Sequence, residues 1–189
     1  MKKQIRRGVF ETNSSSMHSL SIHRIGIRTP IKYDYDDIQE DDNMLHIKFG
    51  EFGWGYERYG DSYHKLQYAL TMVLVTDARD AVCADDFYNT EGFKEINELI
   101  KEKFNCDGIV IEDRFKTDSY YRTKWDDEKK EWVEDENDLY VYLSCDGYID
   151  HQSCESYGSL QDFLNSYGIT LEDFIFDPGI ELIIDNDNH

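Results

Sequence analysis

The residues that could do chemistry are concentrated near the start of the chain. Arg6 to Ile22 reads Arg-Arg-Gly-Val-Phe-Glu-Thr-Asn-Ser-Ser-Ser-Met-His-Ser-Leu-Ser-Ile. It combines two arginines, a carboxylate, an amide, five serines and a histidine with very few apolar residues. A segment that only had to fold would not need so many different hydrogen-bonding groups. The stretch therefore indicates a binding or catalytic site.

A second polar cluster, Asp150-His151-Gln152-Ser153, lies far along the chain. Each cluster contains one histidine, His18 in the first and His151 in the second. Two imidazoles in one cleft can share acid and base work near neutral pH. An arginine beside them would hold a phosphate and offset charge that develops in the transition state. These parts would suffice to cleave RNA without a metal, because the 2'-hydroxyl is an internal nucleophile.

We assign roles to both clusters on this basis. The predicted catalytic residues are His18, His151 and Glu11. The predicted phosphate- and substrate-binding residues are Arg6, Arg7, Asn13, Ser14, Ser15, Ser16, Gln152 and Ser153. No metal or cofactor is assigned, and the chain has no Walker loop, G-x-G-x-x-G, H-E-x-x-H or nucleophile elbow.

Other interpretations of the same residues stay open. Each histidine could be a structural residue, and the serines with Asn13 could form a buried network. A serine could act as a nucleophile activated by His18. A metal site could be built from Glu11, His18, Asp150 and His151. The residue pattern does not choose among these reactions, nor between an enzyme and a binding protein.

The charge distribution favours the N-terminal segment as an anion site. The chain has 40 acidic and 20 basic side chains, a formal net charge of -20, so its surface as a whole repels nucleic acid and anionic membranes. Residues 1–32 are the exception, with seven lysines and arginines against a single acid, Glu11. An anion, if one binds, is expected there.

The elements that position these residues follow from hydrophobic periodicity. Alternation from His18 through Leu20 and Ile22 predicts a half-buried strand. Apolar spacing predicts helices over residues 62–75, 78–89, 91–104 and 159–164, and strands over 4–10, 44–49, 109–111, 139–143 and 180–184. Residues 12–16 and 34–42 are expected to be a turn and an acidic loop. Residues 50–60 are expected to be a shaped aromatic loop, and the type of 171–176 is left open.

This order of elements predicts one α+β domain over residues 1–189, with several helices packed on a mixed or antiparallel sheet. Strands and helices alternate without a regular βαβ repeat, and 189 residues suit one well-buried domain. The stretch 116–137 is highly charged, and Trp125 and Trp132 flank its central Asp-Asp-Glu-Lys-Lys. It is expected to be a hairpin or loop insertion with a charged turn.

Several features point to a cytosolic protein. No run of 18 apolar residues is present, and the charged N-terminus is not followed by an apolar signal-peptide core. The cysteines Cys83, Cys106, Cys145 and Cys154 are widely spaced and form no C-x-x-C pair, which favours reduced thiols. The sequence does not indicate an oligomeric state.

The two polar clusters also resemble a known family. Arg7 to Leu20 resembles the N-terminal signature of small proteins encoded by phages, prophages and plasmids of Firmicutes, and 148–153 and 185–187 resemble that family too. Residues 33–145 do not match it. The resemblance implies a mobile-element accessory protein in a bacterial cytoplasm. The chain also resembles the group that contains a type II anti-CRISPR protein, which inactivates Cas9 by truncating its guide RNA.

That resemblance implies a partner and a site. The partner would be the Cas9–guide RNA complex or another host defence nuclease. The substrate would be RNA. The polar signature of the family maps onto Glu11, Asn13, Ser14 to Ser16, His18 and His151. The leading hypothesis is therefore a counter-defence protein that acts on RNA or a phosphate-containing ligand through this site, by phosphodiester cleavage or by binding.

Two rival functions need no such cleavage. The acidic segments Asp34–Asp42 and Asp126–Glu136 could imitate DNA, with carboxylates in place of phosphates, and occupy a basic groove on a nuclease. Neutralising these acids would then abolish inhibition. A small phosphorylated metabolite or nucleotide could instead be the substrate, bound at the basic segment.

Overall fold

The structure, a computed structural model, describes residues 18–24, 38–39, 42–53, 55–150 and 157–186. For 18–24, 38–39 and 185–186 it describes the backbone alone. The strands are β1 His18–Arg24, β2 Ile38–Gln39, β3 Met44–Ile47, β4 Glu51–Phe52, β5 Glu57–Tyr59, β6 Gly108–Ile111, β7 Lys116–Asp126, β8 Glu131–Ser144, β9 Tyr148–Ile149 and β10 Ile180–Asn186. The helices are α1 Ser62–Val75, α2 Ala84–Tyr88, α3 Glu91–Phe104, α5 Leu160–Tyr167 and α6 Leu171–Phe176. This mixture confirms the α+β class.

The described strands form four small sheets. β10 is the central strand of an antiparallel sheet in the order β1-β10-β5, and β3 is central in β2-β3-β6, where it pairs antiparallel with β2 and parallel with β6. β4 pairs parallel with β9, and β7 pairs antiparallel with β8. The predicted sheet is therefore mixed, but it is divided rather than continuous.

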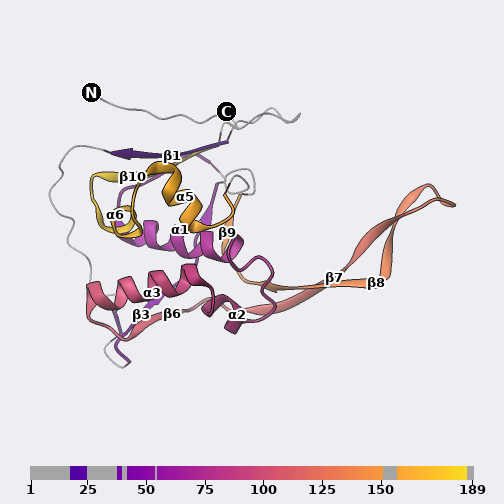
Figure 1. Cartoon of the computed structure of the whole chain (residues 1–189), viewed down its shortest axis with the longest axis horizontal. Coiled ribbons are helices and arrows are strands. Elements are labelled where there is room, and N and C mark those ends of the chain that lie inside the picture. Colours follow the sequence, from indigo (N-terminus) through magenta and orange to yellow (C-terminus); the bar gives the residue numbers. More distant parts are fainter. Residues whose placement is uncertain (1–17, 25–37, 40–41, 54, 151–156, 187–189) are drawn as a thin grey trace.

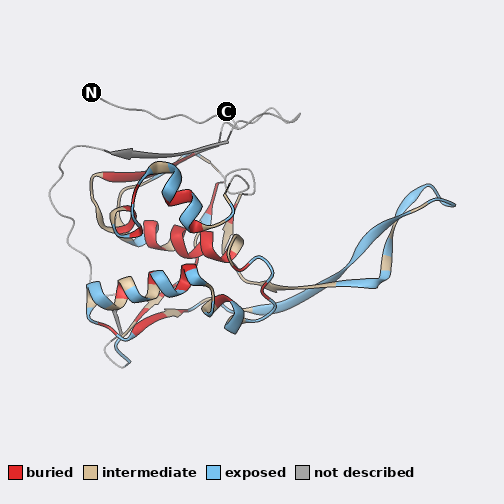
Figure 2. Cartoon of the chain, viewed as in Figure 1, coloured by how far each residue is buried: buried red, intermediate tan, exposed pale blue. Residues whose placement is uncertain are grey.

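Helix α1 is the centre of the hydrophobic core. It packs against α3, α5, α6 and β9, and Figure 1 shows it between α3 on one side and α5 and α6 on the other. Nearly every residue in its middle is buried, so Figure 2 shows it mainly in red. Tyr68, Leu70 and Met72 are completely buried. A helix that is apolar on most sides requires partners on most sides.

The two long helices begin and end where local chemistry predicts. The Asp61 carboxylate accepts a hydrogen bond from the backbone N–H of His64 at 2.9 Å and caps α1. The Thr90 hydroxyl accepts one from Phe93 at 3.2 Å and caps α3, and Asn105 at φ 52° ends that helix in the left-handed region. The predicted bounds 62–75 and 91–104 are both confirmed.

Several other predicted elements need correction. The helix expected over 78–89 covers only α2, residues 84–88, because residues 76–80 form a turn and residues 81–83 are not helical. The loop expected over 50–60 contains two short strands, β4 and β5, since its backbone pairs with β9 and β10. The expected acidic loop 34–42 contains β2.

Other elements differ only in length or type. The strand expected over 44–49 ends at Ile47, the helix expected over 159–164 continues to Tyr167, and 180–184 continues to Asn186. The undecided segment 171–176 is helix α6, capped by Thr170. The strand and turn predicted over 4–10 and 12–16 lie outside the described residues. Cys83, Cys106 and Cys145 are free thiols, and Cys154 lies outside the described residues.

The hairpin expected near 116–137 is present and longer than predicted. β7 and β8 pair from Lys116↔Ser144 to Asp126↔Glu131, so the strand expected over 139–143 is the base of β8. Figure 1 shows this pair projecting far from the helices as an arm, and Figure 2 shows it exposed over most of its length. We call residues 116–144 the arm.

Candidate functional site

The structure describes little of the site predicted from the two polar clusters. Outside the described residues lie Arg6, Arg7, Glu11, Asn13, Ser14, Ser15, Ser16, His151, Gln152 and Ser153. His18 is described as backbone only, where it is the first residue of β1. The roles assigned to these side chains therefore stay predictions.

The described backbone does bring the neighbourhoods of the two clusters to one end of a sheet. In the β1-β10-β5 sheet, His18 of β1 is opposite Asn186 of β10. Glu57 of β5 is opposite Ile184, which precedes Asn186 by two residues on β10. The Glu57 carboxylate accepts a hydrogen bond from the backbone N–H of Gly53 at 3.2 Å. Asp150 packs against Gly53. The start of β1 and the residue preceding His151 thus lie near the same sheet end.

Gly53 is required for that approach. Its φ is +99°, and a Cβ at this position would lie 2.6 Å from the Cβ of Asp150. The backbone N–H of Asp150 donates to the Phe52 carbonyl oxygen at 2.9 Å, and the Tyr148 hydroxyl lies 3.1 Å from the Asp150 carboxylate. These contacts hold the chain that leads into the second polar cluster against the β4–β5 connection.

An Asp–His pair at the start of α1 was missed in the sequence. His64 Nδ1 lies 2.8 and 2.9 Å from the two carboxylate oxygens of Asp61. Because an ionised carboxylate only accepts hydrogen bonds, the Nδ1–H of His64 is the donor in this contact. The ring stacks on Tyr59 at 4.9 Å. The D-x-x-H spacing at a helix cap is the signal that could have revealed the pair.

Electrostatics at this pair reflect its partly buried position. Burial raises the pKa of the Asp61 carboxyl, but hydrogen bonds from the His64 backbone and ring outweigh it and leave the pKa lowered. Burial and the neighbouring Glu57 charge raise the pKa of Tyr59 to about 12. Asp61 already serves as the α1 cap, and His64 is nearly half exposed. The pair could transfer a proton to a ligand, but its geometry is explained by capping alone.

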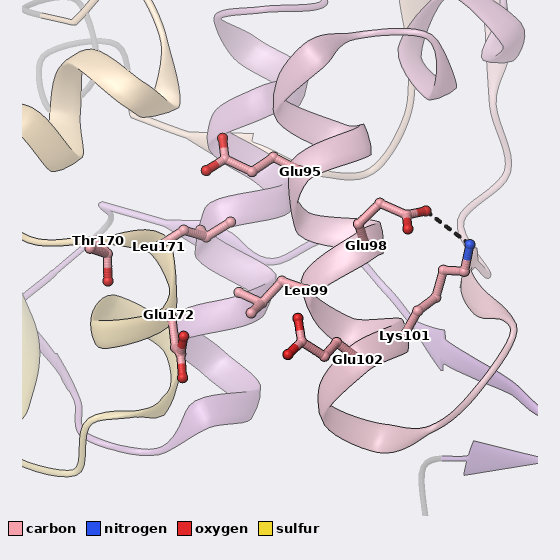
Figure 3. A pocket seen from close by; sticks show the side chains of 8 residues that line it. All are labelled: Glu95, Glu98, Leu99, Lys101, Glu102, Thr170, Leu171 and Glu172. Carbon is pink, nitrogen blue, oxygen red and sulfur yellow. Dashed lines mark hydrogen bonds and ion pairs between the residues drawn. The ribbon is translucent and has the colours of Figure 1, made fainter.

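A hollow of about 660 Å³ lies between α3 and α6. Figure 3 shows four glutamates and one lysine around it; its lining is Glu95, Glu98, Leu99, Lys101, Glu102, Thr170, Leu171 and Glu172. Lys101 is paired with Glu98 at 2.9 Å, and that hydrogen bond raises its pKa. Lys103 on α3 pairs with Glu172 on α6. With most of its charge negative, this hollow disfavours phosphate.

The described residues offer no evident metal centre. Nowhere in the described ranges do three or more histidine, cysteine or carboxylate side chains gather in a way that could hold a metal ion. In the same ranges, no helix is long and apolar enough to cross a membrane.

The arm is the most exposed organised surface in the described part of the chain. It contains nine acidic and five basic residues. Five of its large apolar side chains are exposed: Tyr120, Tyr121, Trp125, Trp132 and Leu139. A two-stranded ribbon is only marginally stable alone in water. Because these five side chains are exposed, they gain little free energy from burial in this chain. Folding therefore does not explain why large apolar residues stand at these positions.

Aromatic and ionic contacts stiffen the arm locally. Near its base, Tyr120, Tyr140 and Tyr142 contact one another with ring centroids 5.4–5.9 Å apart. Near its tip, Trp125 and Trp132 are directly opposite each other at 5.8 Å.

The tip turn is held by Asp126. Its carboxylate accepts from the backbone N–H groups of Glu128 and Lys129 at 2.9 and 3.0 Å. The bond from Lys129 is the main cause that lowers the pKa of Asp126.

No protein-family model, curated protein or solved structure matches this chain.

Proposed function

We propose that the protein is a non-enzymatic binding protein whose arm occupies a basic groove of a partner that normally holds nucleic acid. The observation that carries this proposal is the arm itself: a long exposed ribbon with an excess of carboxylates and half-exposed aromatic rings. Tryptophan and tyrosine are enriched among the residues that dominate binding energy. Carboxylates around them would steer the arm towards positive charge.

The shape of the arm supports this function. A two-stranded ribbon is narrow enough to enter the major groove of a duplex, so it is narrower than the duplex itself and can enter a protein cleft that admits one. The arm projects clear of the helices in Figure 1, so its tip can enter a cleft without the body following. The net charge of -20 would also oppose association with nucleic acid itself and favour a cationic protein surface.

The family resemblance of the two polar clusters suggests which partner to test. A counter-defence protein of a mobile element would act in the bacterial cytoplasm on a host nuclease such as the Cas9–guide RNA complex. Such an enzyme needs a basic groove for its nucleic acid. Occupying that groove would inhibit the nuclease without any chemical step.

A second candidate function is metal-free RNA cleavage at the N-terminal polar site. The observation that favours it is the common sheet end shared by the start of β1 and Asp150. If the imidazoles of His18 and His151 face each other there, they would act as the acid–base pair, with Arg6 and Arg7 on the phosphate. The Asp61–His64 pair adjoins β5 of the same sheet.

One experiment separates the two candidates. The full chain is mixed with the Cas9–guide RNA complex, and both target-DNA binding and the length of the guide RNA are measured. A triple variant of the arm, Glu128→Gln, Glu134→Gln and Glu136→Gln, is expected to lose inhibition. A matched triple variant on α3, Glu95→Gln, Glu98→Gln and Glu102→Gln, removes the same charge and is expected to keep it.

The remaining outcomes are equally informative. Inhibition with an intact guide RNA, unaffected by His18→Ala, supports groove occupation. A shortened guide RNA, with cleavage lost in His18→Ala and kept in the arm variant, contradicts it and supports the second candidate. No effect on either measurement excludes this nuclease as the partner.

A further inference from the structure

The outer part of the arm presents an aromatic pair with carboxylates on the same face. Trp125 and Trp132 are cross-strand partners with an interplanar angle of 71°, and they are 46% and 67% exposed. Glu134 is two residues from Trp132 along β8 and therefore lies on the same face of the ribbon. Asp127 accepts a hydrogen bond from Trp125 Nε1 at 3.2 Å. Exposed indole rings and acidic groups thus share one surface.

The inner part of the arm already holds a guanidinium on such a surface. Arg122 Cζ lies 4.6 Å from the centroid of the Tyr140 ring, which stacks on Tyr142 at an interplanar angle of 14°. A guanidinium over an aromatic face is attracted by the ring quadrupole, and tryptophan is the best such face. The outer surface offers two indole rings and adds a carboxylate that a guanidinium can hydrogen-bond.

We infer that the face formed by Trp125, Trp132 and Glu134 binds an arginine side chain of the partner. The inference rests on the proposed function, because it names the cation that the arm takes up in a basic groove. The guanidinium stacks on an indole ring while its N–H groups donate to Glu134. A lysine ammonium is more strongly hydrated and cannot stack in this way, so arginine is preferred at equal charge.

The test compares two peptides of equal charge. The full chain is titrated with hexa-arginine and with hexa-lysine, and binding is followed by the NMR signals of the indole N–H groups together with the dissociation constants. We expect hexa-arginine to bind about three- to fivefold more tightly, because stacking and hydrogen bonding to Glu134 favour the guanidinium over the ammonium by about the size of one exposed cation–π contact. The indole signals of Trp125 and Trp132 are expected to move with it.

Matched variants locate the preference. Glu134→Gln is expected to reduce the preference for hexa-arginine over hexa-lysine. Trp132→Phe, which keeps an aromatic ring at the position, is expected to reduce this preference too. Glu131→Gln is the control. Glu131 is the cross-strand neighbour of Asp126 and lies on the opposite face of the ribbon, and this substitution removes the same charge as Glu134→Gln. This control is expected to keep the arginine preference. A separate control, Tyr63→Leu, changes an exposed aromatic residue on α1, away from the arm.

Each remaining outcome overturns the inference in a different way. Equal affinity for the two peptides leaves binding driven by charge alone, so the arginine site is wrong and the proposed function stands. No binding of either peptide overturns both. If a single-stranded oligonucleotide moves the indole signals at lower concentration than hexa-arginine does, the face is a nucleic-acid surface instead.

Discussion

The body around α1 and the arm formed by β7 and β8 use aromatic and apolar residues in opposite ways. In the body, Tyr68, Phe163 and Phe174 are completely buried and contact one another. In the arm, Trp125 and Trp132 also contact each other, yet both are about half exposed or more. The same residue classes therefore stabilise the fold in one region and remain available for recognition in the other.

This difference teaches where function can reside in a chain with few recognisable motifs. Buried contacts are explained by the free energy of folding, which is small in net terms and sensitive to each core residue. An exposed aromatic pair on a two-stranded ribbon has no comparable explanation. Substitutions should thus have large effects on stability in the body, and effects mainly on binding in the arm.

The largest contrast is expected between Leu70→Ala and Trp132→Ala. Leu70 is fully buried in α1, so its truncation leaves a cavity and should reduce the free energy of unfolding by about 2–5 kcal/mol. Trp132 is 67% exposed, and its truncation should leave the global midpoint nearly unchanged. Urea unfolding followed by far-UV circular dichroism checks both. Equal losses of unfolding free energy in the two variants would show that the arm unfolds cooperatively with the core. The proposed difference between body and arm would then be wrong.

Lys65 tests whether the body tolerates charge. It is fully buried, and its Nζ donates to the carbonyl oxygens of Asp177 and Ile180 at 3.0 and 3.1 Å. Burial lowers its pKa from 10.5 to about 8, against the opposing charges of Asp177, Asp61 and Glu181. Between pH 8 and 10.5 the unfolded chain therefore holds a proton at this lysine that the folded chain has lost.

The sign of the pH dependence follows from that difference. Stability rises with pH where the unfolded state binds more protons. Relative to Lys65→Met, the wild-type protein should thus gain stability from pH 8 to 10.5, by at most about 3 kcal/mol. Unfolding midpoints of both proteins across this range check it. Burial raises the pKa of Cys145 to about 11, which makes stability fall with pH in the same range. This effect is the same in both proteins, so it cancels when the stability of Lys65→Met is subtracted from that of the wild type. A constant difference would contradict the prediction.

Gly53 tests the junction that leads to the second polar cluster. Gly53→Ala should destabilise the protein by about 1–3 kcal/mol, because alanine is strained at φ +99° and its Cβ would collide with Asp150. Gly55→Ala is the matched control, since a Cβ there meets nothing within 4 Å. Thermal unfolding of the two variants measures the gap. Similar midpoints would mean that this junction adapts and does not hold the chain near Asp150.

The smallest expected effect concerns local opening in the native state. Backbone amides near the arm tip, between Trp125 and Trp132, should exchange their hydrogens through local fraying, whereas those of Leu70 and Met72 in α1 should exchange only on global unfolding. Hydrogen exchange measured by NMR at several urea concentrations distinguishes the two. Tip amides as protected as those of α1 would indicate that the arm is rigid without a partner.

The chain sequence alone determined most local structure. Apolar spacing predicted α1 and α3 with their observed bounds, because the residues that end these helices act locally. Asp61 and Thr90 cap the helices by accepting hydrogen bonds from backbone N–H groups three positions on, and Asn105 ends α3 in the left-handed conformation. The hairpin turn was predicted for the same reason. The two polar clusters were also found in the sequence, and the roles of their side chains stay predictions.

Tertiary structure alone decided what depends on partners far along the chain. The strands β4 and β5 exist because residues 50–60 meet β9 and β10, which no local pattern reveals. Lys65 is buried because two carbonyl oxygens more than a hundred positions away accept its hydrogen bonds. The same holds for the arm: the highly charged stretch 116–137 predicts a hairpin, but only the packing around it determines that the hairpin projects into solvent with Trp125 and Trp132 exposed.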